Sequence, residues 1–134
     1  MRERDKKIDE FLARRAFAVA GASTDREKYG NKVVRVYQQN NKTVYPINPR
    51  AREVEGEKAY ASVGDIPAED FALSLVTPPQ VTLDVVRAAL KRGVRYFWMQ
   101  PGAENEQAVK EAEEQGATVI HGGACVLVAL HYHE

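Results

Sequence analysis

The sequence predicts a three-layer α/β fold in which a doubly wound, mostly parallel sheet of about five strands carries helices on both faces. Short apolar runs, which need burial on both faces, alternate along the chain with segments of helical periodicity. Glycine, proline or asparagine follows most of these segments and ends them. The chain has 134 residues, 44% of them hydrophobic, and shows no linker or internal repeat. We therefore expect one domain with one core over residues 1–134.

The first part of the chain is expected to contain two helices and two strands. Ile8, Phe11 and Leu12 share one side of the opening helix, so we expect the segment 1–15 to pack on the core. The expected elements are a helix at 5–14, a strand at 17–20, a helix at 29–39 and a strand at 43–47.

The second part is expected to alternate strand and helix after a long polar connection at 51–67. Three apolar side chains attach this connection to the domain, namely Val54, Tyr60 and Val63. The expected elements are a strand at 71–76, a helix at 81–91, a strand at 94–99, a helix at 104–114 and a strand that begins at 118–120. Gly93 and Gly116 end the two helices. Helices that link parallel strands in this way imply right-handed crossovers.

Charge and composition exclude several classes of partner. Lys and Arg together number 19, as do Asp and Glu, so no net basic field attracts nucleic acid or an anionic membrane surface. The N-terminal segment is charged, and no apolar run reaches the ~20 residues of a membrane span. Cys125 is the only cysteine and has no partner for an internal disulfide. We expect a cytoplasmic protein that binds neither nucleic acid nor membrane.

The loops that follow the first four strands are chemically unusual. They are GAST at 21–24, NPR at 48–50, TPP at 77–79 and QPG at 100–102. In open α/β sheets, ligands bind beyond the carboxyl ends of the strands, where these loops meet around one crevice. Turns also favour Gly, Pro and Asn for purely structural reasons, and this alternative explains any single loop equally well. The four loops together favour a binding site.

The first loop suits a phosphate group. Gly21 allows a close backbone approach, and Ser23 and Thr24 offer hydroxyl donors beside free amides near a helix N-terminus. The standard dinucleotide fingerprint G-x-G-x-x-G is absent, because its second and third glycine positions hold Ser23 and Arg26.

The end of the second strand favours a ribose that carries an extra phosphate. An NAD site needs Asp or Glu there, whereas this strand ends in Ile47, Asn48, Pro49 and the cation Arg50. NADP and coenzyme A both have such a phosphate, and charge alone does not separate them. The polar first loop and the two proline-closed strand ends favour the extended, uncharged pantetheine arm of CoA over a nicotinamide ring.

Several motifs occur together in a characteristic order: AGASTDREKYGNKV, VYPINPR, EVEGEKAYASVGDIP, VTPP, GVRYFWMQPGAENE and the late Cys125. With these motifs, the chain from about Ala16 to Cys125 resembles the CoA-binding domain family. These are small Rossmann-like proteins similar to the N-terminal domain of the succinyl-CoA synthetase α subunit. In the family, the first loop holds CoA phosphates and the basic residue after the Asn-Pro turn contacts the nucleotide.

The resemblance implies a set of CoA-binding residues from four loops and one helix N-terminus. They are Gly21, Ala22, Ser23, Thr24, Arg26, Tyr29, Gly30, Asn31, Lys32, Asn48, Pro49, Arg50, Val76, Thr77, Pro78, Pro79, Gln100, Pro101 and Gly102. The chain departs from the family at Arg50, where lysine is usual; a guanidinium keeps the charge in a planar, fork-like shape that suits phosphate. The tail VLVALHYHE also departs, since many relatives have a carboxylate and a basic ending there.

No complete catalytic or metal-binding constellation is evident. Cys125 lies beside an apolar run and is interpreted as a small buried thiol. His121, His131 and His133 lack further ligands at metal-binding spacing. The related ligases use additional domains for catalysis, so the resemblance implies a CoA or acyl-CoA binding protein without catalytic activity of its own. The alternatives are a small NADP-dependent oxidoreductase and an interaction subunit of a larger acyl-CoA ligase, and a homodimer is the default oligomer.

Overall fold

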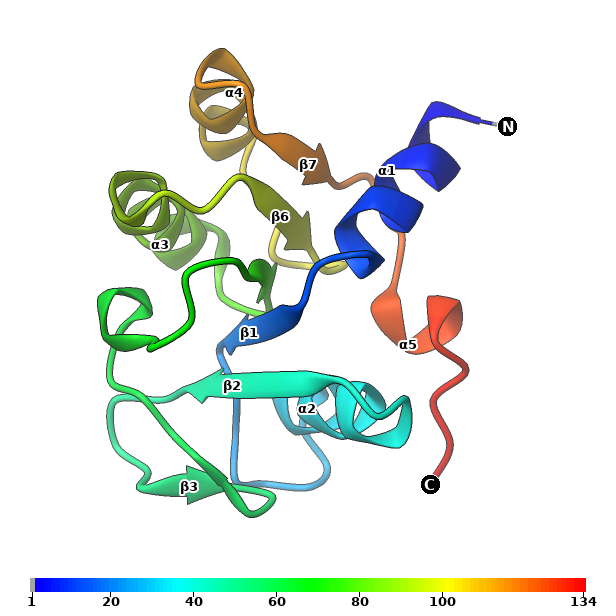
Figure 1. Cartoon of the computed structure of the whole chain (residues 1–134), viewed down its shortest axis with the longest axis vertical. Helices are drawn as coiled ribbons and strands as arrows, with labels where there is room; N and C mark the ends of the chain where they lie inside the picture. The colour runs from blue at the N-terminus through cyan, green and yellow to red at the C-terminus, as the bar shows by residue number, and fades with distance from the viewer. Residues whose placement is uncertain (1) are drawn as a thin grey trace.

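The computed structural model describes residues 2–134 and contains a five-stranded, wholly parallel sheet. The strands lie in the order β2-β1-β5-β6-β7 (Figure 1). Their bounds are β1 Ala16–Ala20, β2 Thr43–Ile47, β5 Ala72–Leu75, β6 Tyr96–Met99 and β7 Thr118–Ile120. The chain first moves outward from β1 to β2 and then returns to build β5, β6 and β7 on the other side of β1. The strand order therefore reverses beside β1, which is where open α/β sheets bind ligands.

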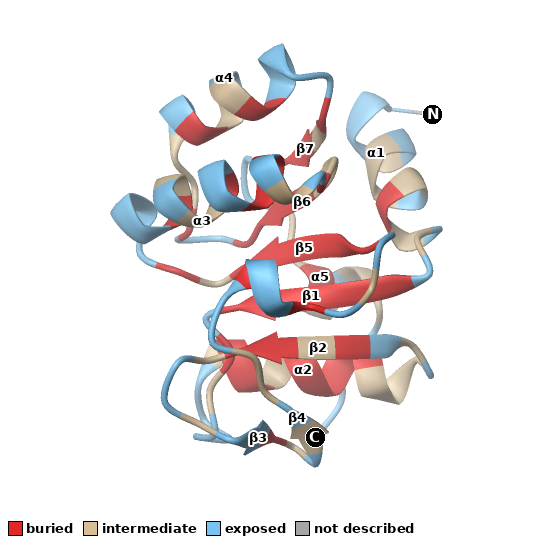
Figure 2. Cartoon of the chain, turned by 60° about the vertical axis from the view of Figure 1, so that its left-hand side comes forward, coloured by how far each residue is buried: buried red, intermediate tan, exposed pale blue. Residues whose placement is uncertain are grey.

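Helices cover both faces of the sheet, which confirms the predicted three-layer α/β class. One face carries α1 (Glu3–Leu12), α2 (Tyr29–Gln39) and the short α5 (Val126–Ala129), and the other carries α3 (Pro79–Arg92), α4 (Glu106–Glu114) and the 3-10 turn η1 (Val63–Asp65). Figure 2 shows buried strands between helices whose outward faces are exposed. The double burial explains the continuous apolar runs of the strands.

Strand β1 shows how one short segment serves two cores. Ala16, Ala18 and Ala20 belong to the core under α3 and α4, whereas Phe17 and Val19 belong to the core under α2. Successive side chains of a strand point to opposite faces, so the alternation of small and large residues gives each helix layer its own packing surface. The aromatic ring of Phe17 stacks on that of Tyr37 at 4.7 Å between centroids.

Helix α1 packs on the sheet through one aromatic side chain. Phe11 is fully buried and meets the ring of Trp98 edge-on, with 5.3 Å between centroids. Burial of one such side chain contributes about 2–3 kcal/mol to folding. The helix begins and ends two residues before the predicted 5–14.

Two short elements differ from the predictions. The segment predicted as an irregular connection contains a two-stranded antiparallel hairpin, β3 (Glu53–Val54) and β4 (Glu57–Lys58), and the chain after β7 forms α5. Strands of two residues and a helix of four are too short to produce a periodic pattern, and tertiary contacts stabilise them instead. Val54 and Val63 are buried as expected and attach the connection to the domain.

Candidate functional site

Three adjoining hollows lie at the carboxyl edge of the sheet. The first hollow, of about 520 Å³, lies between the ends of β1 and β2 and the helix α3. Its walls include Ala20, Ile47, Arg50, Val63, Val81 and Asp84. The second, of about 460 Å³, lies over the first loop; its walls include Gly21, Ser23, Tyr29, Gly30, Asn48 and Val76. The third, of about 220 Å³, lies over the ends of β5 and β6; its walls are Val76, Thr77, Pro78, Pro101, Gly102 and Ala103. Shared wall residues join the three into one edge of the molecule.

Two glycines permit three backbone segments to meet at this edge. Gly21 has a φ of +87°, and a Cβ there would lie 2.1 Å from the carbonyl oxygen of Val76. A Cβ on Gly30 would lie 2.0 Å from the carbonyl oxygen of Gly21. Larger residues are therefore excluded at both positions by the protein itself, since the first loop, the end of β5 and the start of α2 occupy that space. The close packing places the N-terminus of α2 against the second hollow.

Asn48 connects the first loop to the second. Its side-chain amide donates to the carbonyl oxygen of Ala22 at 3.0 Å, and its Oδ1 accepts from the amides of Arg50 and Ala51 at 2.8 and 3.0 Å. An Asx turn of this kind fixes the backbone after the strand. The side chain of Arg50 is exposed at the wall of the first hollow, where the sequence places the phosphate-binding cation.

Thr77 fixes the third loop to the fourth. It is buried, and its Oγ1 lies 2.6 Å from that of Thr82, which in turn donates to the carbonyl oxygen of Ala103 at 2.8 Å. The walls of the third hollow, Pro78 and Gly102 among them, are thus held on a rigid frame. Of the residues predicted for these two loops, only Pro79 and Gln100 lie outside the walls of the hollows described here.

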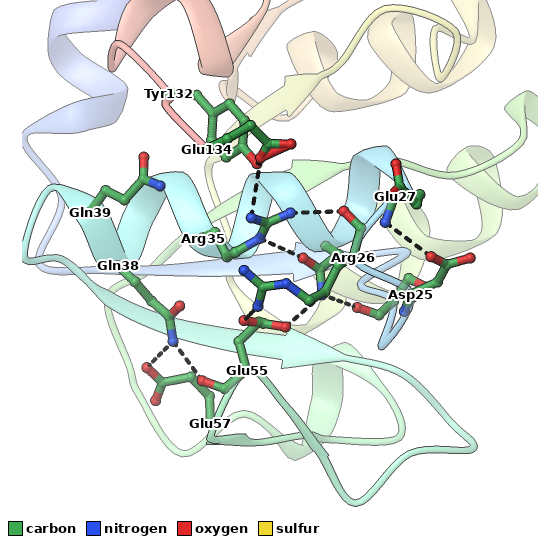
Figure 3. Close-up of polar contacts among 12 residues, drawn as sticks. Asp25, Arg26, Glu27, Arg35, Gln38, Gln39, Glu55, Glu57, Tyr132 and Glu134 are labelled. Carbon is green, nitrogen blue, oxygen red and sulfur yellow. Dashed lines mark hydrogen bonds and ion pairs between the residues drawn. The ribbon is translucent and has the colours of Figure 1, made fainter.

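Asn31 and Arg26 lie in a different place from the hollows. Asn31 is fully buried: its Nδ2 donates to the carbonyl oxygen of Ser23 at 2.9 Å and to Glu55 at 3.0 Å, and its Oδ1 accepts from Arg35 Nε at 2.7 Å. The guanidinium of Arg26 pairs with the Glu55 carboxylate, and Arg35 donates to the carbonyl oxygen of Arg26 at 2.8 Å (Figure 3). We call these four residues, Arg26, Asn31, Arg35 and Glu55, the loop network.

The loop network binds the first loop to the β3–β4 hairpin. The hydrogen bond from Asn31 and then the charge of Arg26 lower the pKa of the Glu55 carboxyl below its ordinary value, while burial opposes them. The network therefore holds a carboxylate beside two guanidinium groups, with every member bonded to another. Thr24 and Lys32, also predicted as binding residues, lie outside the walls of the three hollows as well.

Sequence reasoning missed Arg35 and Glu55. A cation inside the apolar run VVRVY was a signal for Arg35, because a buried guanidinium needs bonded partners. Glu55 carried no such signal, since EGEK is an ordinary turn sequence and its partners lie more than twenty residues away along the chain. Helix α3 contributes an apolar wall to the first hollow with Val81, Val85 and Ala88.

A second polar cluster lies behind the second hollow and joins three distant segments. Gln100 is fully buried, and its Oε1 accepts from the amide of Val126 at 2.9 Å and from the hydroxyl of Tyr29 at 3.1 Å. The same hydroxyl lies 2.8 Å from Cys125 Sγ. We call Tyr29, Gln100 and Cys125 the thiol cluster. Cys125 is half-buried rather than buried as predicted; it is the N-cap residue of α5 and precedes the fully buried Val126.

The thiol cluster is neutral and incompletely bonded. Burial, followed by the hydrogen bond with Cys125, raises the pKa of Tyr29 far above its ordinary value, so the hydroxyl keeps its proton. The amide of Val126 can only donate, which fixes Oε1 of Gln100 toward it and leaves Nε2 as the free end. In the described part of the chain, this buried Nε2 has no hydrogen-bond partner.

The family is decided by a match over most of the chain. The family model of the CoA binding domain matches residues 15–131. This chain belongs to the CoA-binding domain family. The predicted family resemblance is thereby confirmed, and the three hollows lie at the edge where such a domain carries its predicted ligand loops.

Relatives of this CoA-binding domain are of two sizes. The α subunit of acetate–CoA ligase [ADP-forming] II from Pyrococcus furiosus is 35% identical over 111 residues, which cover 80% of this chain but 24% of the ligase subunit. A solved hypothetical protein from Pyrococcus horikoshii is 30% identical with a TM-score of 0.87, and the match covers 97% of this chain and 90% of that one. A solved conserved hypothetical protein from Pyrococcus furiosus is 36% identical with a TM-score of 0.81, over 86% and 98% of the two chains. The chain thus spans about a quarter of the ligase subunit and nearly all of the small proteins.

Within residues 2–134, no group of three or more His, Cys, Asp or Glu side chains is arranged to hold a metal ion. Over the same residues, no helix combines the length and the apolar character needed to cross a membrane.

Proposed function

We propose that this domain binds coenzyme A or an acyl-CoA along the carboxyl edge of its sheet, and that the chain by itself catalyses no reaction. The continuity of the three hollows carries the proposal. The first is predominantly apolar and suits the adenosine, the second lies at a helix N-terminus and suits phosphate, and the third is a shallow groove that suits pantetheine.

The nucleotide end of the ligand is recognised by Arg50. This guanidinium stands exposed at the first hollow, and the Asx turn of Asn48 fixes its backbone. A 3′-phosphate on the ribose brings a charge of roughly −1.5 to −2 to this point, and a planar guanidinium binds phosphate with paired, charge-assisted hydrogen bonds. The diphosphate then lies over Gly21 and Ser23, where backbone amides and a hydroxyl are close.

The pantetheine arm runs from the second hollow into the third. Val76, which belongs to both, and Pro78 form one wall of this path, and Pro101 and Gly102 form the other. The arm is uncharged and carries two amides, so it needs apolar contact and a few backbone hydrogen bonds rather than ion pairs.

A second function, as the CoA-binding part of a larger acyl-CoA ligase, is favoured by the coverage of the relatives. The ligase of Candidatus Korarchaeum cryptofilum, described as a dinucleotide-forming acetyl-coenzyme A synthetase, matches 80% of this chain with a TM-score of 0.71, but this chain covers only 25% of it. Both functions use the same CoA site. They differ in whether the domain needs partner domains for a reaction.

Thermal unfolding with four ligands tests the CoA site. CoA at ~100 times its dissociation constant contributes roughly 2.7 kcal/mol to the stability of the folded protein and raises its melting temperature. NAD is expected to leave the melting temperature unchanged, and dephospho-CoA to raise it less than CoA. NADP is the decisive control: stabilisation by NADP together with no effect of CoA would support the oxidoreductase alternative and overturn the proposal.

A further inference from the structure

The walls of the first hollow carry two charged side chains, Arg50 and Asp84. Arg50 belongs to the loop after β2 and is the cation that we assign to the 3′-phosphate. Asp84 belongs to α3 and is exposed. Because a carboxylate and a phosphate repel each other, Asp84 is suited to a part of the ligand other than its phosphates.

The sequence of α3 places Asp84 on the face that lines the first hollow. Val81, Asp84, Val85 and Ala88 follow the spacing i, i+3, i+4, i+7 of one helix face, and all four belong to the walls of this hollow. Three of the four are apolar. A flat apolar group that packs on this face therefore has one carboxylate beside it.

The carboxylate of Asp84 is free to accept hydrogen bonds from a ligand. Within residues 2–134 it forms no ion pair. Arg87, one turn further along α3, donates instead to the Glu111 carboxylate through two hydrogen bonds of 2.8 and 2.7 Å. The cation nearest to Asp84 along the helix is thus held by another carboxylate.

Ser62 offers a second acceptor in the same walls. Its hydroxyl donates to Asp65 Oδ2 at 3.1 Å, so the oxygen keeps lone pairs but has no proton left to donate. The side chains of Asn48 and Thr77, which also line this hollow, already form hydrogen bonds within the protein. Asp84 and Ser62 therefore both favour a ligand group that donates.

We propose that Asp84 selects adenine among the purine bases by accepting a hydrogen bond from its 6-amino group. This inference rests on the proposed function, in which the base of CoA lies in the first hollow. Adenine has an N–H donor at its 6-position, whereas guanine and hypoxanthine have a carbonyl oxygen there. The amino group binds the carboxylate, while a carbonyl oxygen is repelled by it and leaves both groups without a hydrogen bond.

Calorimetric titration of the whole chain with three nucleoside 3′,5′-bisphosphates tests the inference. These compounds keep the base, the ribose and the adjoining phosphates of CoA, and each differs from the adenosine compound at one group. The adenosine compound should bind about tenfold more tightly than the inosine compound, the size expected for one hydrogen bond to a charged group. The 2′-deoxyadenosine compound keeps the amino group but lacks a ribose hydroxyl, and it should bind as tightly as the adenosine compound.

Matched variants assign the preference to one side chain. Asp84→Asn keeps the size of the side chain, and its amide can accept from an amino group or donate to a carbonyl oxygen. We expect this variant to bind the adenosine and inosine compounds equally. The ratio of the two affinities is the readout, because loss of a negative charge strengthens the binding of every phosphate compound. Glu114→Gln removes one charge at an exposed position on α4, outside the hollows, and should keep the preference for adenosine.

The outcomes separate this inference from the proposed function. Equal binding of the adenosine and inosine compounds, in a protein that CoA stabilises against heat, would overturn the role of Asp84 and leave the CoA site standing. A preference for adenosine that persists in Asp84→Asn would overturn it as well, since another group would then recognise the base. Weak binding of the 2′-deoxy compound to the natural protein alone would assign the carboxylate to the ribose hydroxyl instead. No binding of any compound, together with no stabilisation by CoA, would overturn both proposals.

Discussion

The loop network and the thiol cluster flank the same end of α2, yet they are built differently. In the loop network, Asn31 bonds Ser23, Glu55 and Arg35, and the two guanidinium groups stand beside one carboxylate. In the thiol cluster, the Tyr29 hydroxyl keeps its proton because burial raises its pKa, and a buried donor of Gln100 has no partner among the described residues. A cluster in which every polar group has a hydrogen-bond partner is held in one geometry. A buried donor without a partner can still form a hydrogen bond with another molecule.

The same difference separates the two arginines of the proposed site. Arg26 is paired with Glu55 and its carbonyl oxygen is bonded to Arg35, so it serves the loop. Arg50 stands exposed at the first hollow, and within residues 2–134 it forms no ion pair. The paired residues of this edge hold the fold, and the unpaired ones are the groups we assign to the ligand.

Removal of Asn31 is expected to have the largest effect. Asn31→Leu removes one hydrogen bond from each of three groups: the Ser23 carbonyl, the Glu55 carboxylate and Arg35 Nε. We expect the free energy of unfolding to fall by about 3 kcal/mol. Urea unfolding measures this loss. Asn105→Ala, which removes the side-chain cap of α4 and an exposed hydrogen bond to the carbonyl oxygen of Pro79, is the control and should cost about 1 kcal/mol. Equal losses in the two variants would contradict the structural role of the loop network.

Replacement of Arg26 and of Arg50 by alanine compares how an ion-paired and an unpaired arginine affect ligand binding. Arg50→Ala should weaken CoA binding by about 1.5–3 kcal/mol, roughly ten- to hundredfold, and leave dephospho-CoA nearly unaffected. Arg26→Ala should weaken both ligands by similar factors, because it loosens the loop rather than removing a phosphate contact. Titration calorimetry of the two ligands with each variant forms a double cycle. Equal weakening of both ligands by Arg50→Ala would reassign that residue to the fold.

Removal of the Gln100 carboxamide should cost less than removal of Asn31. Gln100→Leu takes away the acceptor of Tyr29 and Val126 but also removes a donor that is now unpaired, so the two effects partly cancel. We expect a loss of about 1 kcal/mol in the same urea experiment. A loss as large as that of Asn31→Leu would show that a bound water or another group already completes the thiol cluster.

Glu55 should give an effect about as small as that of Gln100, with a distinct dependence on pH. Its folded-state pKa lies below the ordinary value of 4.5, so the ionised form stabilises the folded protein above that pH, and the contribution is lost as pH falls through the folded-state pKa. Glu55→Gln should therefore lower the melting temperature by a few degrees at pH 7, which corresponds to about 1 kcal/mol. The difference from the natural protein should disappear in more acidic solution. A difference that persists unchanged at acid pH would mean that charge is not the cause.

The sequence by itself determined the α/β class, the five strands and the loops at their carboxyl ends. Hydrophobic periodicity reports which side of each element is buried, and runs such as AFAVA at Ala16–Ala20 report burial on both sides. The turn residues Gly21, Asn48 and Gln100 marked the ends of strands, and the family motifs placed CoA at that edge. These properties depend on residues that are close together in the chain, so they can be predicted from a single sequence.

The tertiary structure shows which of these residues line the hollows and which contact one another. The strand order beside β1, the hairpin that brings Glu55 to Asn31, and the contact of Tyr29 with Cys125 join segments far apart in the chain. Periodicity carries no information about such partners, because a polar side chain in a pattern looks the same whether it meets solvent, a ligand or a distant guanidinium. The β3–β4 hairpin places Glu55 beside Arg26, whereas Arg50 lies in the wall of the first hollow.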